Sequence, residues 1–325
     1  MKRRWVALLF PLFLLLLGLA AWLPAQAGLF ATEAATPTAA AALESVALDT
    51  PTHTVAPTAT STPTETPEPT ATSTPLPTPT ETPAPTPTPT YPPPPDEVHV
   101  PILMYHYISE LPLDADAIRR GLTVTPAIFE AQLRYLQEQG YTSVTLADVY
   151  AALAEGKPLP EKPIVLTFDD GYVDAYTEAL PLLLQYGFVG EFFVLATPAH
   201  YEAAAYMSWD QVAAMAEAGM VMQGHGRDHY DLRGRSYDFL VYQILGIKEA
   251  VEAHTGRPVT FFCYPAGRYD ANTLAVVESA GYLGAVTTEW GATQRLDNRY
   301  TWPRIRVQGG WSLAYFAQVL EGLPR

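Results

Sequence analysis

The sequence predicts an α/β protein whose parallel strands close into a distorted (β/α) barrel of about seven or eight strands. Three observations carry this prediction. Short apolar runs alternate with helix-like segments after residue 95. Four of these helices end in a glycine followed at once by a large apolar residue, at Gly140, Gly187, Gly219 and Gly281. Acidic and histidine side chains directly follow several strands, where α/β folds place their active sites.

The chain begins with a segment typical of exported proteins. Three basic residues at positions 2–4 precede an uncharged apolar stretch at 5–23, and Ala25-Gln26-Ala27 has the small-x-small form of a signal-peptidase site. About 20 apolar residues suffice to cross a bilayer. Residues 1–27 are therefore expected to form an apolar helix, either a cleaved signal peptide or a membrane anchor. In both cases the remainder is expected to be extracellular or at the cell surface.

Residues 28–95 are rich in Pro and Thr, with Thr-Pro pairs that repeat along the segment. Such a composition builds no hydrophobic core and favours extended, polyproline-like chain. We expect a disordered linker that tethers the domain at residues 96–325. That domain, of about 230 residues, is large enough for one α/β core.

The net charge is −15 and the isoelectric point is near 4.8. These values exclude a general electrostatic attraction to nucleic acid or to anionic membranes. The single cysteine, Cys263, excludes an intramolecular disulfide and is expected to be a small buried strand residue. No feature of the sequence indicates an obligate protein partner.

Apolar runs predict strands, and capping residues predict where helices begin. The strands are expected at residues 98–108, 141–145, 164–168, 188–195, 220–223, 259–264, 282–287 and 304–307. The helices are expected at residues 125–140, 146–155, 172–186, 208–218, 236–254, 271–280 and from 312 onward. Thr125-Pro126 is a capping Thr followed by a first-turn Pro, and Ser208 and Ser312 are further caps.

Two adjacent carboxylates, Asp169 and Asp170, end the central strand and are followed by Gly171. Neighbours on an extended strand point to opposite faces, so the backbone must turn if both are to serve one site. Gly171 makes such a turn inexpensive. One carboxylate would then bind a metal while the other accepts a proton. Equally, Asp170 is a candidate cap for a helix that begins near Tyr172.

His225 and His229 follow another strand, four residues apart. Two imidazoles and one carboxylate form the His₂Asp donor set of catalytic zinc sites, which leaves a position for water. Such a pair alone is more often two ordinary loop histidines. Its combination with Asp169 and Asp170 in one barrel favours a metal site.

Thr167-Phe-Asp-Asp-Gly171 resembles the first motif of the polysaccharide deacetylase family of the NodB-homology type, carbohydrate esterase family 4. The resemblance extends from residue 98 to the C-terminus. It implies a distorted (β/α) barrel, with Asp169 as general base. It also implies a divalent metal, with Zn²⁺ favoured, bound by Asp170, His225 and His229. The chain departs from the family at Gly226, where the family has a Ser or Thr whose hydroxyl stiffens the metal-binding loop.

Tyr264-Pro265-Ala266-Gly267 resembles the third motif of the family, which forms one wall of the substrate groove. Tyr264, Pro265 and Ala266 are therefore candidate substrate or oxyanion contacts, and the backbone N–H of Ala266 can donate without any side chain. The Arg that often precedes the family's Pro is absent. Arg304 is a candidate replacement that orients Asp169, with a surface ion pair as an equal alternative.

Many family members have a general-acid His near the C-terminus, whereas this chain has none after His254. The segment 101–106 instead resembles the circularly permuted branch of the family, which acts on poly-N-acetylglucosamine-like exopolysaccharides. The resemblance makes His106 the candidate general acid. Tyr105 should then point the other way, into packing.

The sequence therefore predicts an exported, metal-dependent N-deacetylase that releases acetate from N-acetylhexosamine polymers, whether exopolysaccharide, peptidoglycan or chitin-like. A catalytically impaired glycan-binding module and an O-acetyl (xylan-type) esterase remain alternatives. A glycosidase is a further alternative. It needs two carboxylates roughly 5–9.5 Å apart across the scissile bond, which adjacent Asp169 and Asp170 match poorly.

Overall fold

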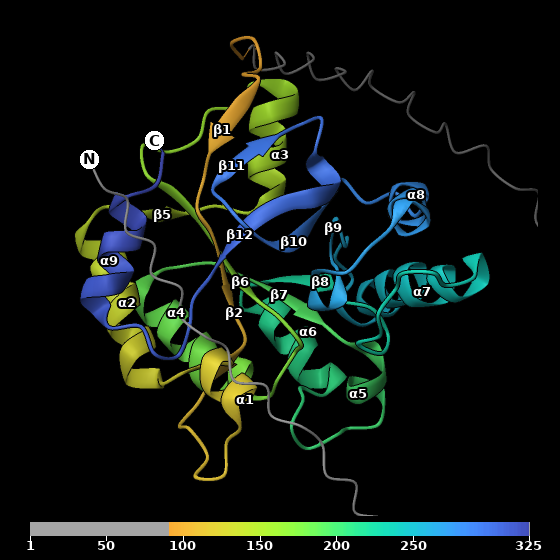
Figure 1. Ribbon diagram of the computed structural model, residues 1–325, viewed down its shortest axis with the longest axis horizontal. Helices are drawn as coiled ribbons and strands as arrows, with labels where there is room; N and C mark the ends of the chain where they lie inside the picture. The colour runs from red at the N-terminus through yellow and green to blue at the C-terminus, as the bar shows by residue number, and fades with distance from the viewer. Residues whose placement is uncertain (1–90, 325) are drawn as a thin grey trace, which may run out of the picture. The chain divides into compact units, whose positions relative to one another are not determined.

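The computed structural model describes residues 91–324, which form a ring of strands surrounded by helices (Figure 1). The parallel strands close into a barrel in the order β2, β12, β10, β9, β8, β7 and β6, and β6 pairs back onto β2. The barrel strands are β2 (Ile102–Tyr105), β6 (Pro163–Phe168), β7 (Gly190–Val194), β8 (Val221–Gly224), β9 (Phe261–Cys263), β10 (Gly284–Trp290) and β12 (Trp302–Arg306). The short β5 (Thr142–Ser143) extends the sheet beside β6. The predicted (β/α) barrel is confirmed.

The expected signal or anchor at residues 1–27 and nearly all of the linker at 28–95 lie outside the described residues. Among residues 91–324, no helix combines the length and the apolar character that crossing a bilayer requires.

Helices surround the barrel on the outside. They are α1 (Ala117–Leu122), α2 (Pro126–Glu138), α3 (Leu146–Glu155), α4 (Leu180–Tyr186), α5 (Ala196–His200), α6 (Trp209–Glu217), α7 (Tyr237–Thr255), α8 (Ala271–Ser279) and α9 (Leu313–Glu321). On one side of the barrel α2 packs against α4 and α9, and on another α7 packs against α6 and α8 (Figure 1).

Local sequence explains where many of these helices begin and end. The side chains of Thr125, Thr145, Ser208, Ser236 and Ser312 each accept a hydrogen bond from the backbone N–H three residues later. The four helix-ending glycines predicted from the sequence all have positive φ, between 72° and 93°. A left-handed residue stops the helix and redirects the chain, so the next strand follows within a few residues.

The strand expected at residues 98–108 is wrong as a single element. It is divided into β1 (Glu97–His99), β2 and β3 (Tyr107–Ile108). β1 pairs antiparallel with β11 (Thr293–Arg295), and β3 pairs with β4 (Thr123–Val124). Pro101 separates β1 from β2, because its nitrogen has no hydrogen to donate to a ladder.

The helix expected to begin near Tyr172 begins only at Ala175. Its first turn is a π-helix (Ala175–Ala179) that continues into α4. Tyr172 instead forms a β-bridge with Tyr206, and this bridge holds the chain away from the helical path.

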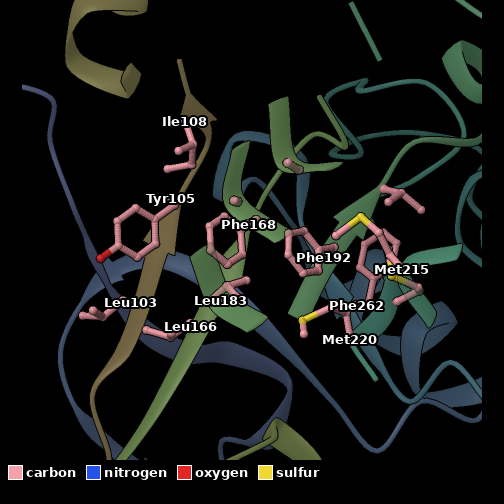
Figure 2. Packing of buried hydrophobic residues seen from close by; sticks show 14 of the residues in the cluster. Leu103, Tyr105, Ile108, Leu166, Phe168, Leu183, Phe192, Met215, Met220 and Phe262 are labelled. Carbon is pink, nitrogen blue, oxygen red and sulfur yellow. The ribbon is translucent and has the colours of Figure 1, made fainter. Parts of the chain in front are cut away.

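Successive residues of the barrel strands face opposite sides, and both sides are filled. Inside the barrel, the buried cluster includes Val165, Phe193, Phe261, Val286 and Trp302. Outside, a larger cluster packs between strands and helices, where Tyr105, Phe168 and Phe192 stack in a row (Figure 2). Their ring centroids are 5.3 and 4.6 Å apart. The barrel is a packed core, so chemistry is confined to its ends.

Glu191 on β7 is a carboxylate inside this core, with 1% of its surface exposed. It accepts hydrogen bonds from the backbone N–H of Leu146 and from Nε2 of Gln223. Among the described residues it has no ion-pair partner. Burial therefore raises the pKa of Glu191 from 4.5 to about 7, although both hydrogen bonds oppose this shift.

We expect Glu191→Gln to flatten the pH dependence of stability. A raised carboxyl pKa means that the folded state binds the proton more tightly than the unfolded state. The wild type should therefore lose about 3 kcal/mol as pH rises from 4.5 to 7, and nothing further above 7. Urea unfolding across this range should show the loss in wild type and in the exposed control Glu249→Gln, but not in Glu191→Gln. Parallel curves for all three proteins would contradict the assignment.

Candidate active site

The candidate functional residues gather at the carboxyl ends of the barrel strands. His106 directly follows β2, Asp169 follows β6, His225 follows β8 and Tyr264 follows β9. Because the barrel strands are parallel, these ends lie together.

A pocket of about 510 Å³ lies at this end of the barrel. Of the predicted site residues, it is lined by His106, Asp169, Asp170, His225, His229, Tyr264 and Ala266. Pro265 and Arg304 are buried and do not line it. The barrel thus brings residues from four separated segments into one cavity.

Asp169 and Arg304 form a buried ion pair. Arg304 Nη1 donates to Asp169 Oδ1 at 2.8 Å and Nη2 donates to Oδ2 at 2.7 Å. The Nε of Arg304 donates to the carbonyl of Thr287, and Nη1 also donates to Thr167 Oγ1. Arg304 has no exposed surface, so the alternative of a surface ion pair is wrong.

The ion pair controls the charge of Asp169. Burial alone would raise the pKa of this carboxyl, but the Arg304 guanidinium outweighs burial and holds the pKa well below its usual range. Asp169 is therefore ionised at neutral pH and held in one orientation by two hydrogen bonds.

The turn that places both aspartates in the pocket is strained. Asp170 has φ of 74° and Gly171 has φ of 73°, so two consecutive residues are left-handed. A Cβ at Gly171 would lie 3.2 Å from Val194 Cα. A non-glycine residue in this region costs of order 1–3 kcal/mol, and such strain clusters at functional sites. Asp170 caps no helix, because the next helix begins at Ala175 and follows Asp174.

Asp170, His225 and His229 form a cluster that fits a metal. Asp170 Oδ1 lies 3.2 Å from His225 Nε2 and 3.4 Å from His229 Nε2. This oxygen is buried and accepts no hydrogen bond within residues 91–324. The three candidate ligand atoms all lie within 4.8 Å of one another.

The hydrogen bonding of His225 supports this fit. Its Nδ1 lies 2.7 Å from the carbonyl oxygen of Cys263, which can only accept, so Nδ1 carries the hydrogen. In the neutral ring, Nε2 then presents a lone pair toward Asp170 Oδ1. A cation between these two acceptors satisfies both of them, either a proton on Nε2 or a metal ion. One carboxylate and two imidazoles form a donor set that suits Zn²⁺ or a similar divalent ion.

His106 lies in the same pocket, and its Nδ1 is buried without a hydrogen-bond partner in the described part of the chain. Burial lowers the pKa of His106; Asp169 and Asp170 oppose this, while Arg304 and Arg306 reinforce it. Tyr105 faces the other side as predicted, where its hydroxyl donates to Gln132 Oε1 at 3.0 Å. An imidazole with an unused nitrogen in a pocket is able to transfer a proton to a bound ligand.

The segment after β9 forms a tight turn at the pocket. Ala266 has φ of 54°, and a Cβ at Gly267 would lie 2.1 Å from Thr288 Oγ1. The Tyr264 hydroxyl donates to the carbonyl of Tyr300, which leaves this side chain in a structural role. Of the three candidate contacts, Ala266 is exposed at the pocket and Pro265 is buried.

Sequence reasoning missed several residues of the pocket. Ala117, Ile118 and Leu122 of α1 form an apolar wall, and Arg306 and Gln308 line the same cavity. The Nε of Arg306 is buried without a hydrogen-bond partner among the described residues. The sequence did offer a signal for Arg306. It lies two residues after Arg304 on β12, and residues i and i+2 share a face of a strand.

Cys263 is buried in β9, as predicted, yet it also touches the ion pair. Its Sγ lies 3.1 Å from Arg304 Nη2 and 3.5 Å from Asp169 Oδ2. Burial raises the pKa of this thiol, so Cys263 stays neutral beside Asp169 at neutral pH.

Comparisons with known proteins agree with this geometry. The sequence profile described as polysaccharide deacetylase matches residues 156–285. YxkH of Bacillus subtilis (strain 168), assigned by its name to the polysaccharide deacetylases, is 32% identical over 69% of this chain and 77% of its own length. The Streptococcus pyogenes deacetylase PplD, solved in complex with acetate, is 29% identical. The match covers 68% of this chain and 97% of the PplD chain, with a TM-score of 0.63.

A shorter match links the chain to the poly-beta-1,6-N-acetyl-D-glucosamine N-deacetylase of Escherichia coli (strain K12). The identity is 44% over 70 residues, which are 22% of this chain and 10% of that protein.

A (β/α) barrel with a carboxylate pair and a His₂Asp cluster at one end defines a hydrolase of the NodB-homology class. With the matches above, the chain belongs to the polysaccharide deacetylase family.

Proposed function

We propose that this protein is an exported, metal-dependent N-deacetylase that hydrolyses the acetamide groups of an N-acetylhexosamine polymer. The observation that carries the proposal is the single pocket shared by Asp169, His106 and the Asp170–His225–His229 cluster. The 70-residue match to a poly-N-acetylglucosamine deacetylase favours an exopolysaccharide substrate. Peptidoglycan and chitin-like polymers are the other candidates.

In this proposal each residue has a separate role. A divalent metal, with Zn²⁺ favoured, would be bound by Asp170, His225 and His229 and would polarise the acetamide carbonyl and acidify water. Asp169, kept ionised by Arg304, accepts a proton from the attacking water. The backbone N–H of Ala266 is the proposed donor to the developing oxyanion.

His106 completes the reaction by donating a proton to the amine nitrogen as the carbon–nitrogen bond breaks. An amine leaves poorly unless it is protonated, so this step needs an acid on the substrate's leaving-group side. Water and the acetamide are thereby converted into acetate and a free amino sugar.

Export is part of the same proposal. The basic and apolar N-terminal segment would direct the chain across a membrane, and residues 5–23 would retain it there if they are not cleaved. The linker would then hold the catalytic domain away from the membrane, at a cell-surface or extracellular polymer.

An acetate-release assay over a panel of glycans, with metal content measured on the same sample of the full chain, tests the proposal. We expect acetate from an N-acetylated polymer and about one bound metal per chain. Metal without acetate would indicate a glycan-binding module, and acetate only from acetylated xylan would indicate an O-acetyl esterase. Release of reducing ends would indicate a glycosidase.

We expect His106→Ala to retain metal and fold but to lose deacetylation by roughly 10²-fold or more. A general acid acts only when protonated, so the activity that it supports falls as pH rises through its pKa. The alkaline limb of the pH–rate profile should therefore shift or disappear in the variant. His99→Ala is the control, because His99 lies on β1 and does not line the pocket. Wild-type turnover with an intact alkaline limb would show that another group donates the proton.

A further inference from the structure

Helix α7 holds the loop between His225 and His229, here called the metal loop, through the side chain of Gln243. Gln243 of α7 has 1% of its surface exposed, on a helix face otherwise buried through Leu240, Ile244, Ile247 and Val251. A buried amide among apolar residues costs free energy unless its hydrogen bonds are made. Its partners therefore indicate why it is there.

Within residues 91–324, every hydrogen bond of the Gln243 side chain goes to the loop between His225 and His229. Its Oε1 accepts from the backbone N–H of Arg227 at 2.9 Å and of Asp228 at 3.0 Å. Its Nε2 donates to Asp228 Oδ2 at 2.9 Å. One side chain thus fixes two consecutive peptide groups and one carboxylate. His229 directly follows Asp228, so these hydrogen bonds also restrict the position of His229.

The backbone conformation of Gly226 and its lack of a side chain both suit the hydrogen bonds that Gln243 makes. Its φ of 90° is a conformation that residues with a side chain rarely adopt. A Cβ at this position would lie 3.3 Å from Gln243 Oε1. The family's Ser or Thr at this position would therefore press against the amide oxygen that binds the loop.

We propose that Gln243 is the positioning residue of the metal site and replaces the hydroxyl that Gly226 lacks. It presets the loop so that His225 and His229 both point at Asp170. The inference rests on the proposed function only in assuming that the cluster binds a divalent metal. Residues that orient metal ligands from outside change metal affinity by about 10- to 100-fold when removed.

Zinc affinity of the metal-free full chain, measured by competition with a chromophoric chelator, tests this proposal. Gln243→Leu should bind Zn²⁺ about 10- to 100-fold more weakly. The matched control is Gln294→Leu: Gln294 is also fully buried, but its side chain bonds to Val100 near β1, away from the pocket. This control should keep the wild-type zinc affinity. Equal affinities for wild type and Gln243→Leu would overturn the proposal.

A rescue experiment distinguishes positioning from general stability. Gln243→Glu keeps the acceptor for both backbone N–H groups but sets a carboxylate against Asp228, so zinc affinity should fall. Adding Asp228→Asn restores a donor to that contact and should recover most of the affinity. The absorption spectrum of bound Co²⁺ should return to the wild-type shape in the double variant. A double variant as weak as Gln243→Glu would refute the proposal.

Gly226→Ser provides a test that does not alter Gln243. If Gln243 performs the role of the missing hydroxyl, this substitution toward the family motif should weaken zinc binding. An increase in affinity would overturn the inference even if Gln243→Leu proves unfoldable. Failure of the wild type to bind zinc would refute the proposed function instead, so the two failures are distinguishable.

Discussion

His225→Ala is expected to lose bound metal and deacetylase activity together. His225 is 2% exposed, and its ring is fixed by the hydrogen bond from Nδ1 to the Cys263 carbonyl. Removing a ligand should cost more than the roughly 10- to 100-fold that loss of an outer partner costs. Metal analysis and acetate release on the same preparation measure both effects. Added Zn²⁺ should restore activity to chelator-treated wild type but not to the variant.

The comparison with the other histidines sharpens this result. His229→Ala should behave similarly but retain more metal, because the His229 side chain is 44% exposed and less constrained. His200→Ala is the control, since His200 is exposed at the end of α5 and does not line the pocket. Unchanged metal content in both His225→Ala and His229→Ala would rule out the assigned ligands.

Asp169→Asn is expected to reduce turnover by about 10²- to 10⁴-fold, the range of a lost general base. The same change should also destabilise the fold. An amide would set an N–H₂ group against a guanidinium and leave the charge of Arg304 buried without a partner. Breaking a buried pair in this way costs about 3–5 kcal/mol. Urea unfolding and acetate release therefore both need to be measured.

A second substitution separates the two effects of Asp169→Asn. In the double variant Asp169→Asn with Arg304→Gln, two amides replace the ion pair, and no charge is left unpaired. We expect much of the stability to return while activity stays low. Metal content should remain near wild type, because Asp170 is unchanged. Recovery of turnover in the double variant would show that Asp169 positions Arg304 and is not the base.

Local sequence was sufficient for much of the fold. Capping residues such as Thr125 and Ser208 and helix-ending glycines such as Gly140 act within one helical turn, so their effect is visible in a short stretch of chain. The placement of Asp169–Asp170 and His225 after strands follows equally directly, because parallel strands of a barrel end on one side. These local features predicted the barrel and the end of it that carries the pocket.

Tertiary structure alone decided which residues pair within that pocket. Asp169 and Arg304 are 135 residues apart, and the sequence left open whether they meet, because their contact depends on the closure of β6, β2 and β12. No periodic pattern in the sequence predicts the apolar wall of α1 or the hydrogen bonds of Gln243 to the metal loop. Both depend on how a helix packs against a segment distant in sequence. No pattern within either segment specifies which distant segment it will contact.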